Sequence, residues 1–257
     1  MLTAIPILVS FLVAAIYPLC FWISHRDPLK KNFHRFHLGM PVFVLGVLTV
    51  SQMTGPAPFD IKAHLIVWFI VLAGLCAYFW NREYPNPWLI TAPCLIGLAG
   101  FPEIQTELAD PGLHLTFAWG LGAAIFCASL YAMNLGHWYL NVHGLPLDHL
   151  TRAVNVLWVL TAIRLIWDIA VMSSAKVVHQ GTVIPLHQFV LTMDGFLLIL
   201  AVFFGTLFPL ATVFFVHGTL KAKSTQSATG ILYVILTAVL IGEMAYKYYL
   251  LKFSIAL

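Results

Sequence analysis

Charged residues are scarce in this sequence. Of its 257 residues only 9% are Asp, Glu, Lys or Arg, whereas 61% are hydrophobic, and the mean hydropathy is +0.91. Soluble domains carry about 25% charged residues, because their surface must be hydrated. The shortage of charge therefore excludes a sizeable soluble domain and indicates an integral membrane protein in contact with a lipid bilayer.

The low net charge and the lack of paired cysteines exclude further classes of function. The formal net charge is only +3 and no basic stripe is present, so nucleic acid is not an expected partner. The four cysteines, Cys20, Cys76, Cys94 and Cys127, lie in long apolar runs and form no CxxC pair. This placement favours packing between helices over a metal site or a disulfide.

Eight apolar segments are close to the roughly 20 residues that a helix needs to cross a bilayer. They cover residues 2–24, 38–54, 62–80, 87–101, 113–140, 150–174, 186–217 and 229–251. The seventh is long, and a kink at Pro209 would accommodate it. The predicted fold class is all-α, a polytopic transmembrane helix bundle of about eight spans that forms a single integral membrane domain over residues 1–257.

The loops between these segments differ in basic residues, which predicts the orientation. One side has Arg26, Lys30, Lys31, Arg35, Arg82, Arg152, Lys221 and Lys223, and the other has Lys62, Lys176, Lys252 and an acidic stretch over 103–110. We therefore expect a multi-pass protein of a bacterial inner membrane, with both termini outside the cytoplasm.

Five ionisable residues lie in the last three predicted spans. Arg164 and Asp168 are four residues apart, as are Glu243 and Lys247, and Asp194 stands alone. At 1.5 Å per residue, the sequence places Arg164, Asp194 and Glu243 at one height in the outer half of the membrane, about 20 Å from the cytoplasmic side. Because charged side chains in lipid are costly, we expect these groups to face one another or a hydrated cavity.

The five ionisable residues in the last three predicted spans predict proton chemistry. If Arg164 pairs with Asp168 and Lys247 with Glu243, Asp194 keeps no partner, and burial favours its protonated form. His187 precedes Asp194 by seven residues and is expected on the same helix face, where it would relay the proton outward. The candidate catalytic residues are therefore Asp194, Glu243, Arg164, Asp168 and His187. The alternative is a structural polar lock that only fastens the helices.

Eleven histidines are many for a membrane chain, and several stand at the ends of predicted spans. A b-type haem between helices needs two facing histidines. The candidate haem ligands are His64 and His114 on the outer side and His137 and His217 on the inner side. Against a haem stands the absence of any histidine in the middle of a predicted span.

These observations give one leading functional hypothesis and two alternatives. The leading hypothesis is a membrane subunit of a respiratory electron-transfer complex that reacts with quinol or quinone, assembles with other subunits and binds b-type haem if the histidines serve as ligands. In organisation, though not through any motif, such a chain resembles the multi-helix subunits of respiratory complexes that take electrons and protons from quinol. The alternatives are a proton-coupled transporter that uses the same acids and a non-catalytic structural membrane subunit.

Overall fold

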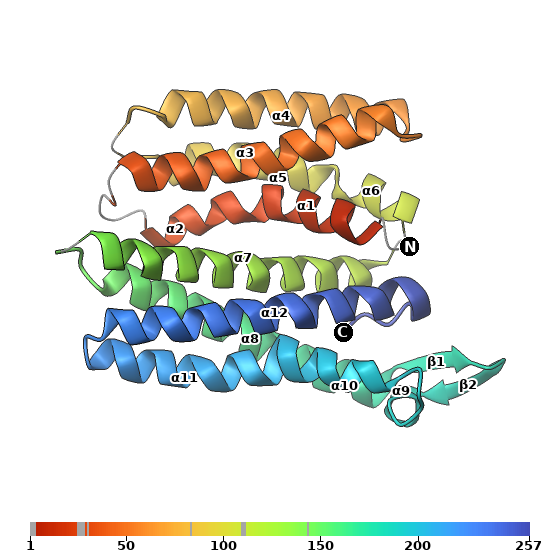
Figure 1. The fold of residues 1–257 in the computed structure, drawn as a ribbon. Helices are drawn as coiled ribbons and strands as arrows, with labels where there is room; N and C mark the ends of the chain where they lie inside the picture. The colour runs from red at the N-terminus through yellow and green to blue at the C-terminus, as the bar shows by residue number, and fades with distance from the viewer. Residues whose placement is uncertain (1–3, 25–28, 30, 83, 109–111, 143) are drawn as a thin grey trace. The chain divides into compact units, whose positions relative to one another are not determined.

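The computed structural model describes residues 4–257 except 25–28, 30, 83, 109–111 and 143 (Figure 1). Eight helices in the described part are long and apolar enough to cross a membrane, and a two-stranded sheet accompanies them. The predicted all-α bundle of about eight spans is thereby confirmed. Arg26, Lys30 and Asp110, which entered the orientation argument, lie outside the described residues.

The chain divides into two compact units, residues 2–108 and 109–257. The first unit holds the first four spans. Its elements are α1 (Ala4–Ile16), the 3₁₀ turn η1 (Tyr17–Cys20), α2 (Phe21–Ser24), α3 (Lys31–Thr54), α4 (Phe59–Phe79), α5 (Pro87–Ala99) and α6 (Phe101–Leu108).

Local sequence explains where several of these helices begin or change. Pro18 cannot donate a backbone hydrogen bond and lies in the 3₁₀ turn that interrupts the first span. The Asn86 side chain accepts a hydrogen bond from the Trp88 amide and caps α5, whose first residue is Pro87. Helix α3 begins seven residues before the predicted span, because its first turns bury Phe33 and His37 within the unit.

The second unit contains the last four spans, a hairpin and a π-helical segment. Its elements are α7 (Leu113–Asn141), α8 (Asp148–Ser174), β1 (Lys176–His179), β2 (Thr182–Pro185), α9 (Leu186–Phe189), α10 (Phe196–Val202), the π segment η2 (Phe203–Leu207), α11 (Phe208–Lys221) and α12 (Thr225–Phe253). Helix α12 packs against α7, α10, η2 and α11, while α8 packs against α7, η2 and α11.

The predicted seventh span, 186–217, is wrong at its first end. A β-hairpin precedes it, α9 is only four residues long, and the membrane-length helix covers residues 196–221. Gly195 stands just before α10, in a turn where a β-carbon would overlap the Phe189 carbonyl. Residues 186–190, which the predicted span includes, belong to this folded connection, where Leu186, Phe189 and Val190 are buried.

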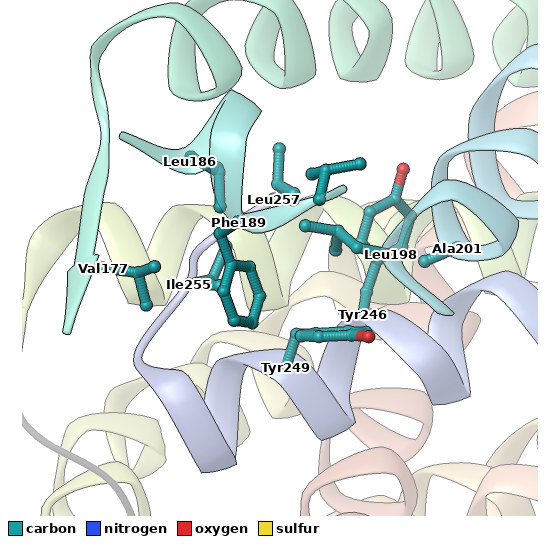
Figure 2. Close-up of a cluster of buried hydrophobic side chains, with 10 residues drawn as sticks. Val177, Leu186, Phe189, Leu198, Ala201, Tyr246, Tyr249, Ile255 and Leu257 are labelled. Atoms are coloured by element: carbon teal, nitrogen blue, oxygen red, sulfur yellow. The ribbon is translucent and has the colours of Figure 1, made fainter. Parts of the chain in front are cut away.

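An apolar cluster joins this connection to the C-terminal end of α12 (Figure 2). It includes Phe189 of α9, Leu198 of α10, Tyr249 of α12 and Ile255 of the C-terminal tail. Tyr246 of α12 belongs to the same cluster, and its hydroxyl group reaches a polar network. The hairpin and the tail therefore cover the helix ends beside the buried charges.

Candidate functional site

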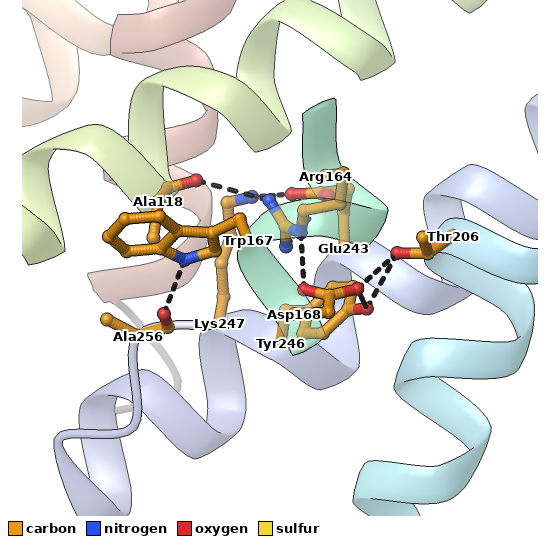
Figure 3. A network of polar contacts seen from close by, with 9 residues as sticks. All are labelled: Ala118, Arg164, Trp167, Asp168, Thr206, Glu243, Tyr246, Lys247 and Ala256. Carbon is orange, nitrogen blue, oxygen red and sulfur yellow. Dashed lines mark hydrogen bonds and ion pairs between the residues drawn. The ribbon is translucent and has the colours of Figure 1, made fainter. Parts of the chain in front are cut away.

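Four charged side chains are buried together in the second unit (Figure 3). Arg164 and Asp168 come from α8, and Glu243 and Lys247 come from α12; none is more than 5% exposed. We call these four residues the ionic cluster. Burial of a charged group costs several kcal/mol unless other charges and hydrogen bonds compensate it, so the contacts within the cluster decide what it can do.

Helix geometry brings these residues to one level. Arg164 lies ten residues before the end of α8, and Glu243 lies ten residues before the end of α12. At 1.5 Å per residue, both side chains start about 15 Å from their helix ends. The expected common height of Arg164 and Glu243 is thus borne out by a direct contact between them, with Arg164 Nη2 3.4 Å from Glu243 Oε1.

Asp168 receives the densest set of contacts in the ionic cluster. Its Oδ1 lies 3.3 Å from Arg164 Nε, while its Oδ2 accepts hydrogen bonds from Thr206 at 2.6 Å and from Tyr246 at 2.8 Å. The Thr206 and Tyr246 hydroxyl oxygens are themselves 2.9 Å apart. Two hydroxyl donors and a guanidinium group stabilise the ionised carboxylate.

Glu243 is held differently. Its Oε2 accepts a hydrogen bond from Lys247 Nζ at 2.6 Å, but its Oε1 has only the longer ion-pair contact with Arg164 and accepts no hydrogen bond. Its carboxylate also packs against Gly122 of α7, where a β-carbon would overlap it. Glu243 Oε1 is therefore a buried acceptor with an unused hydrogen-bonding position.

Arg164 connects the two carboxylates. Besides Asp168 and Glu243 it contacts the Ala118 carbonyl oxygen through Nη1 at 3.4 Å, and its guanidinium carbon lies 4.1 Å from the Tyr246 ring centroid. The planar guanidinium group suits such a site because it can donate in several directions and lie over an aromatic ring. With two cations and two anions, the ionic cluster is electrically balanced.

The helix that faces the ionic cluster is irregular. The π segment η2 lies just before Pro209, whose ring would clash with the Gly205 carbonyl in a regular α-helix. Gly205 and Gly242 are in such close contact that a β-carbon on either would overlap neighbouring atoms. The predicted irregularity near Pro209 is therefore a π segment, and it places the Thr206 hydroxyl group on Asp168.

Asp194 and His187 are not part of this assembly. The Asp194 side chain is 50% exposed in the turn before α10, and its Oδ2 lies 3.0 Å from His179 Nε2 of β1. His187 is exposed on the short helix α9, so it does not share a continuous helix face with Asp194. The expectation of a buried, unpartnered Asp194 was wrong because the chain turns before α10.

The four candidate haem ligands are distributed over the chain. His64 is on α4 and packs on Gly100, which follows the end of α5, while His114 and His137 are 23 residues apart near opposite ends of α7. His137 Nδ1 lies 3.3 Å from the Tyr233 hydroxyl group, and His217 is half-buried on α11. Within the described part of the chain, no three His, Cys, Asp or Glu side chains are grouped to hold a metal ion.

Sequence reasoning missed two members of the polar network, Thr206 and Tyr246. Tyr246 follows Glu243 by three residues, a spacing that places both on one helix face and could have indicated it. Thr206 lies in an otherwise apolar run, and nothing in the sequence distinguishes it from threonines that bond their own helix.

No protein-family profile, curated protein sequence or solved structure matches this chain.

Proposed function

We propose that this protein is a membrane subunit of an electron-transfer complex that reacts with quinol or quinone, and that its ionic cluster takes up and releases a proton. The observation that supports proton exchange is Glu243 Oε1, a buried carboxylate oxygen that accepts no hydrogen bond. Intramembrane ionisable residues are commonly functional, since their burial costs free energy that a purely structural contact does not require.

The contacts divide the work between the two carboxylates. Asp168 already accepts two hydroxyl hydrogen bonds on one oxygen, so protonation there would weaken an established network. Asp168 Oδ1 and Glu243 Oε1 both accept no hydrogen bond, but Asp168 carries two hydroxyl hydrogen bonds on its other oxygen, whereas Glu243 carries one, from Lys247. In this proposal Glu243 is the proton acceptor, Arg164 positions both carboxylates, and Asp168 balances the guanidinium charge.

The redox reaction defines what must be balanced. Oxidation of one quinol releases two electrons and two protons. In this proposal one proton passes to Glu243 and the other is released to the external solution. The two electrons would need a carrier, either a redox centre of a partner subunit or a b-type haem, for which His64, His114, His137 and His217 are the candidate ligands. The absorption spectrum of the purified protein before and after dithionite reduction decides between these carriers.

Substitution of Glu243 tests the proposed proton acceptor. In membranes that contain the complete complex, quinol oxidation and external proton release are measured for Glu243→Gln and for the control Glu103→Gln, whose side chain is exposed on α6. Loss of a proton acceptor reduces rates by about 10²- to 10⁴-fold. Normal turnover of an assembled Glu243→Gln protein would show that the ionic cluster only holds the helices together.

Proton-coupled transport is the second candidate function. The observation in its favour is the π segment in the seventh span beside buried charges, because interrupted membrane helices frequently mark substrate or ion sites. Reconstitution in liposomes separates the two candidates. A transporter moves solute in response to a proton gradient without any redox partner, whereas the proposed subunit consumes quinol.

A further inference from the structure

One exposed side chain of α8 does not suit a lipid environment. Asn155 lies seven residues after Asp148, the first residue of the helix, and its carboxamide is exposed. Within the described part of the chain this carboxamide makes no hydrogen bond. Because hydrocarbon offers no donors or acceptors, an unsatisfied amide group in the membrane is costly.

The depth of Asn155 follows from the length of α8. At 1.5 Å per residue the 27-residue helix is about 40 Å long, so a hydrocarbon core of about 30 Å that is centred on it covers about residues 151–171. Asn155 then lies about 6 Å inside the boundary of that core. Asparagine is too short to extend its polar end to the headgroups, as lysine and arginine do. Its carboxamide therefore needs a protein partner.

Asn155 is on the side of α8 that faces away from the rest of the second unit. Leu157, Thr161 and Arg164 are among the residues of the buried face, and at about 100° per residue Asn155 is about 160° around the helix from Leu157. Exposed and half-exposed side chains follow one another on this outer side at alternating spacings of four and three residues. These side chains, the α8 stripe, are Asn155, Val159, Ala162, Ile166, Ile169 and Ser173. Such a seven-residue repeat is typical of two helices that pack along each other.

The partner that the α8 stripe fits is a second copy of this chain. Copies in one membrane have the same orientation, so two α8 helices related by a two-fold axis along the membrane normal run parallel and bring both Asn155 side chains to one depth. A carboxamide both donates and accepts, so two of them satisfy each other. Asp148 and Arg152 continue the repeat toward the start of α8, where their opposite charges can pair between the copies.

We propose that the protein forms a two-fold symmetric dimer through the α8 stripe, with hydrogen bonds between the two Asn155 carboxamides. The small Ala162 side chain lets the two helices approach closely. Arg164 and Asp168 lie on the buried face of α8, so the ionic cluster stays inside each copy. This inference does not depend on the proposed electron-transfer function.

Cysteine cross-linking in native membranes locates the contact. Val159 on the α8 stripe and Val156 on a flank of the same helix are 46% and 37% exposed. Oxidation is expected to link Val159→Cys and Ile166→Cys into disulfide-bonded dimers, but neither Val156→Cys nor the unmodified protein, whose four cysteines are buried. The proposal is wrong if neither stripe variant gives a dimer, or if Val156→Cys gives as much.

Substitution of Asn155 tests the hydrogen bonds. Fluorescently labelled full-length protein is reconstituted in liposomes at decreasing protein-to-lipid ratios, and energy transfer between copies gives the dissociation constant. Asn155→Leu is expected to raise this constant about tenfold, and Asn155→Gln to restore part of the loss. Thr237→Val is the control, because the exposed Thr237 hydroxyl group bonds to its own helix. An unmodified protein that is monomeric at every ratio, or an Asn155→Leu dimer of undiminished stability, contradicts the proposal.

A helix of a different membrane protein is the competing occupant. Tagged and untagged copies of the chain are expressed together, and the tagged copy is purified from mild detergent. Recovery of the untagged copy, and its loss when both copies carry Val159→Trp, supports the dimer. Stoichiometric recovery of another polypeptide that Val159→Trp abolishes, with no untagged copy present, would assign the α8 stripe to that polypeptide and overturn the proposal.

Discussion

Arg164 on α8 and Glu243 on α12 meet inside the second unit, with 3.4 Å between the guanidinium nitrogen and the carboxylate oxygen. The same guanidinium group contacts Asp168 one turn further along α8. Arg164 is thus shared by two acids from two helices, and the balance of the ionic cluster depends on it. Removal of this one cation would leave Lys247 to compensate both carboxylates.

Replacement of Arg164 is expected to be strongly destabilising. Arg164→Met leaves Asp168 buried without its cation, and removal of one partner from a buried ion pair costs about 3–5 kcal/mol. Thermal unfolding in detergent, followed by circular dichroism and gel filtration, measures the loss. Lys252→Met on the exposed end of α12 is the control and should unfold as the unmodified protein does. An unchanged Arg164→Met protein would contradict the central role of Arg164.

Gly122 and Gly120 provide a matched pair on α7. A β-carbon at Gly122 would overlap the Glu243 carboxylate, whereas one at Gly120 would meet no atom within 4 Å. Gly122→Ala should therefore lower the free energy of unfolding by about 1–3 kcal/mol through overpacking. Gly120→Ala should be neutral or slightly stabilising, because alanine favours the helix. Equal effects of the two substitutions would show that Glu243 moves aside without cost.

The Thr206 hydroxyl group is expected to contribute through Asp168. Thr206→Val keeps the side-chain shape but leaves one acceptor position of a buried carboxylate unused, which costs about 1–3 kcal/mol. The control is Thr237→Val, because the exposed Thr237 hydroxyl group bonds only to the carbonyl oxygen of Tyr233 on its own helix. A double-mutant cycle with Tyr246→Phe should give non-additive losses, since both hydroxyl groups share one carboxylate oxygen. Additive losses would argue against a connected network.

Substitution of Asp194 should have little effect. Its side chain is half exposed and lies within hydrogen-bond distance of His179, and a hydrogen bond of this kind contributes about 1 kcal/mol. Asp194→Asn is therefore expected to fold normally and to retain quinol turnover, in contrast to Glu243→Gln. A loss of proton release in Asp194→Asn would return this residue to the proton pathway.

The parts of the site that could be predicted are those that helix geometry alone determines. A spacing of four residues puts Arg164 beside Asp168 and Glu243 beside Lys247 in any helix, and both pairs are present. The common height of Arg164 and Glu243 followed from counting residues along two long apolar spans. Their contact also depends on how each helix is rotated about its own axis. The positions of the charges in the sequence suggested this rotation but did not determine it.

The misplacement of Asp194 came from a helix boundary. Leu186, Phe189 and Val190 suggested an extension of the seventh span, yet they are buried in the folded connection before α10. A signal was present earlier in the chain: β-branched residues flank Gln180 and Gly181, both of which have a positive φ, as a tight hairpin turn requires. Recognition of that hairpin would still have left the start at residue 186, because β2 ends at Pro185, and it does not indicate the turn before Gly195 that keeps Asp194 outside α10.

The pairing of opposite charges within single helices has a consequence for biogenesis. Each of α8 and α12 contains its own cation and anion one turn apart, so neither helix enters the lipid phase with a net charge in its interior from these residues. Intrahelical neutralisation reduces the cost of inserting each segment before its neighbours are present. The additional contact that joins Arg164 to Glu243 can then form as the separately inserted helices associate.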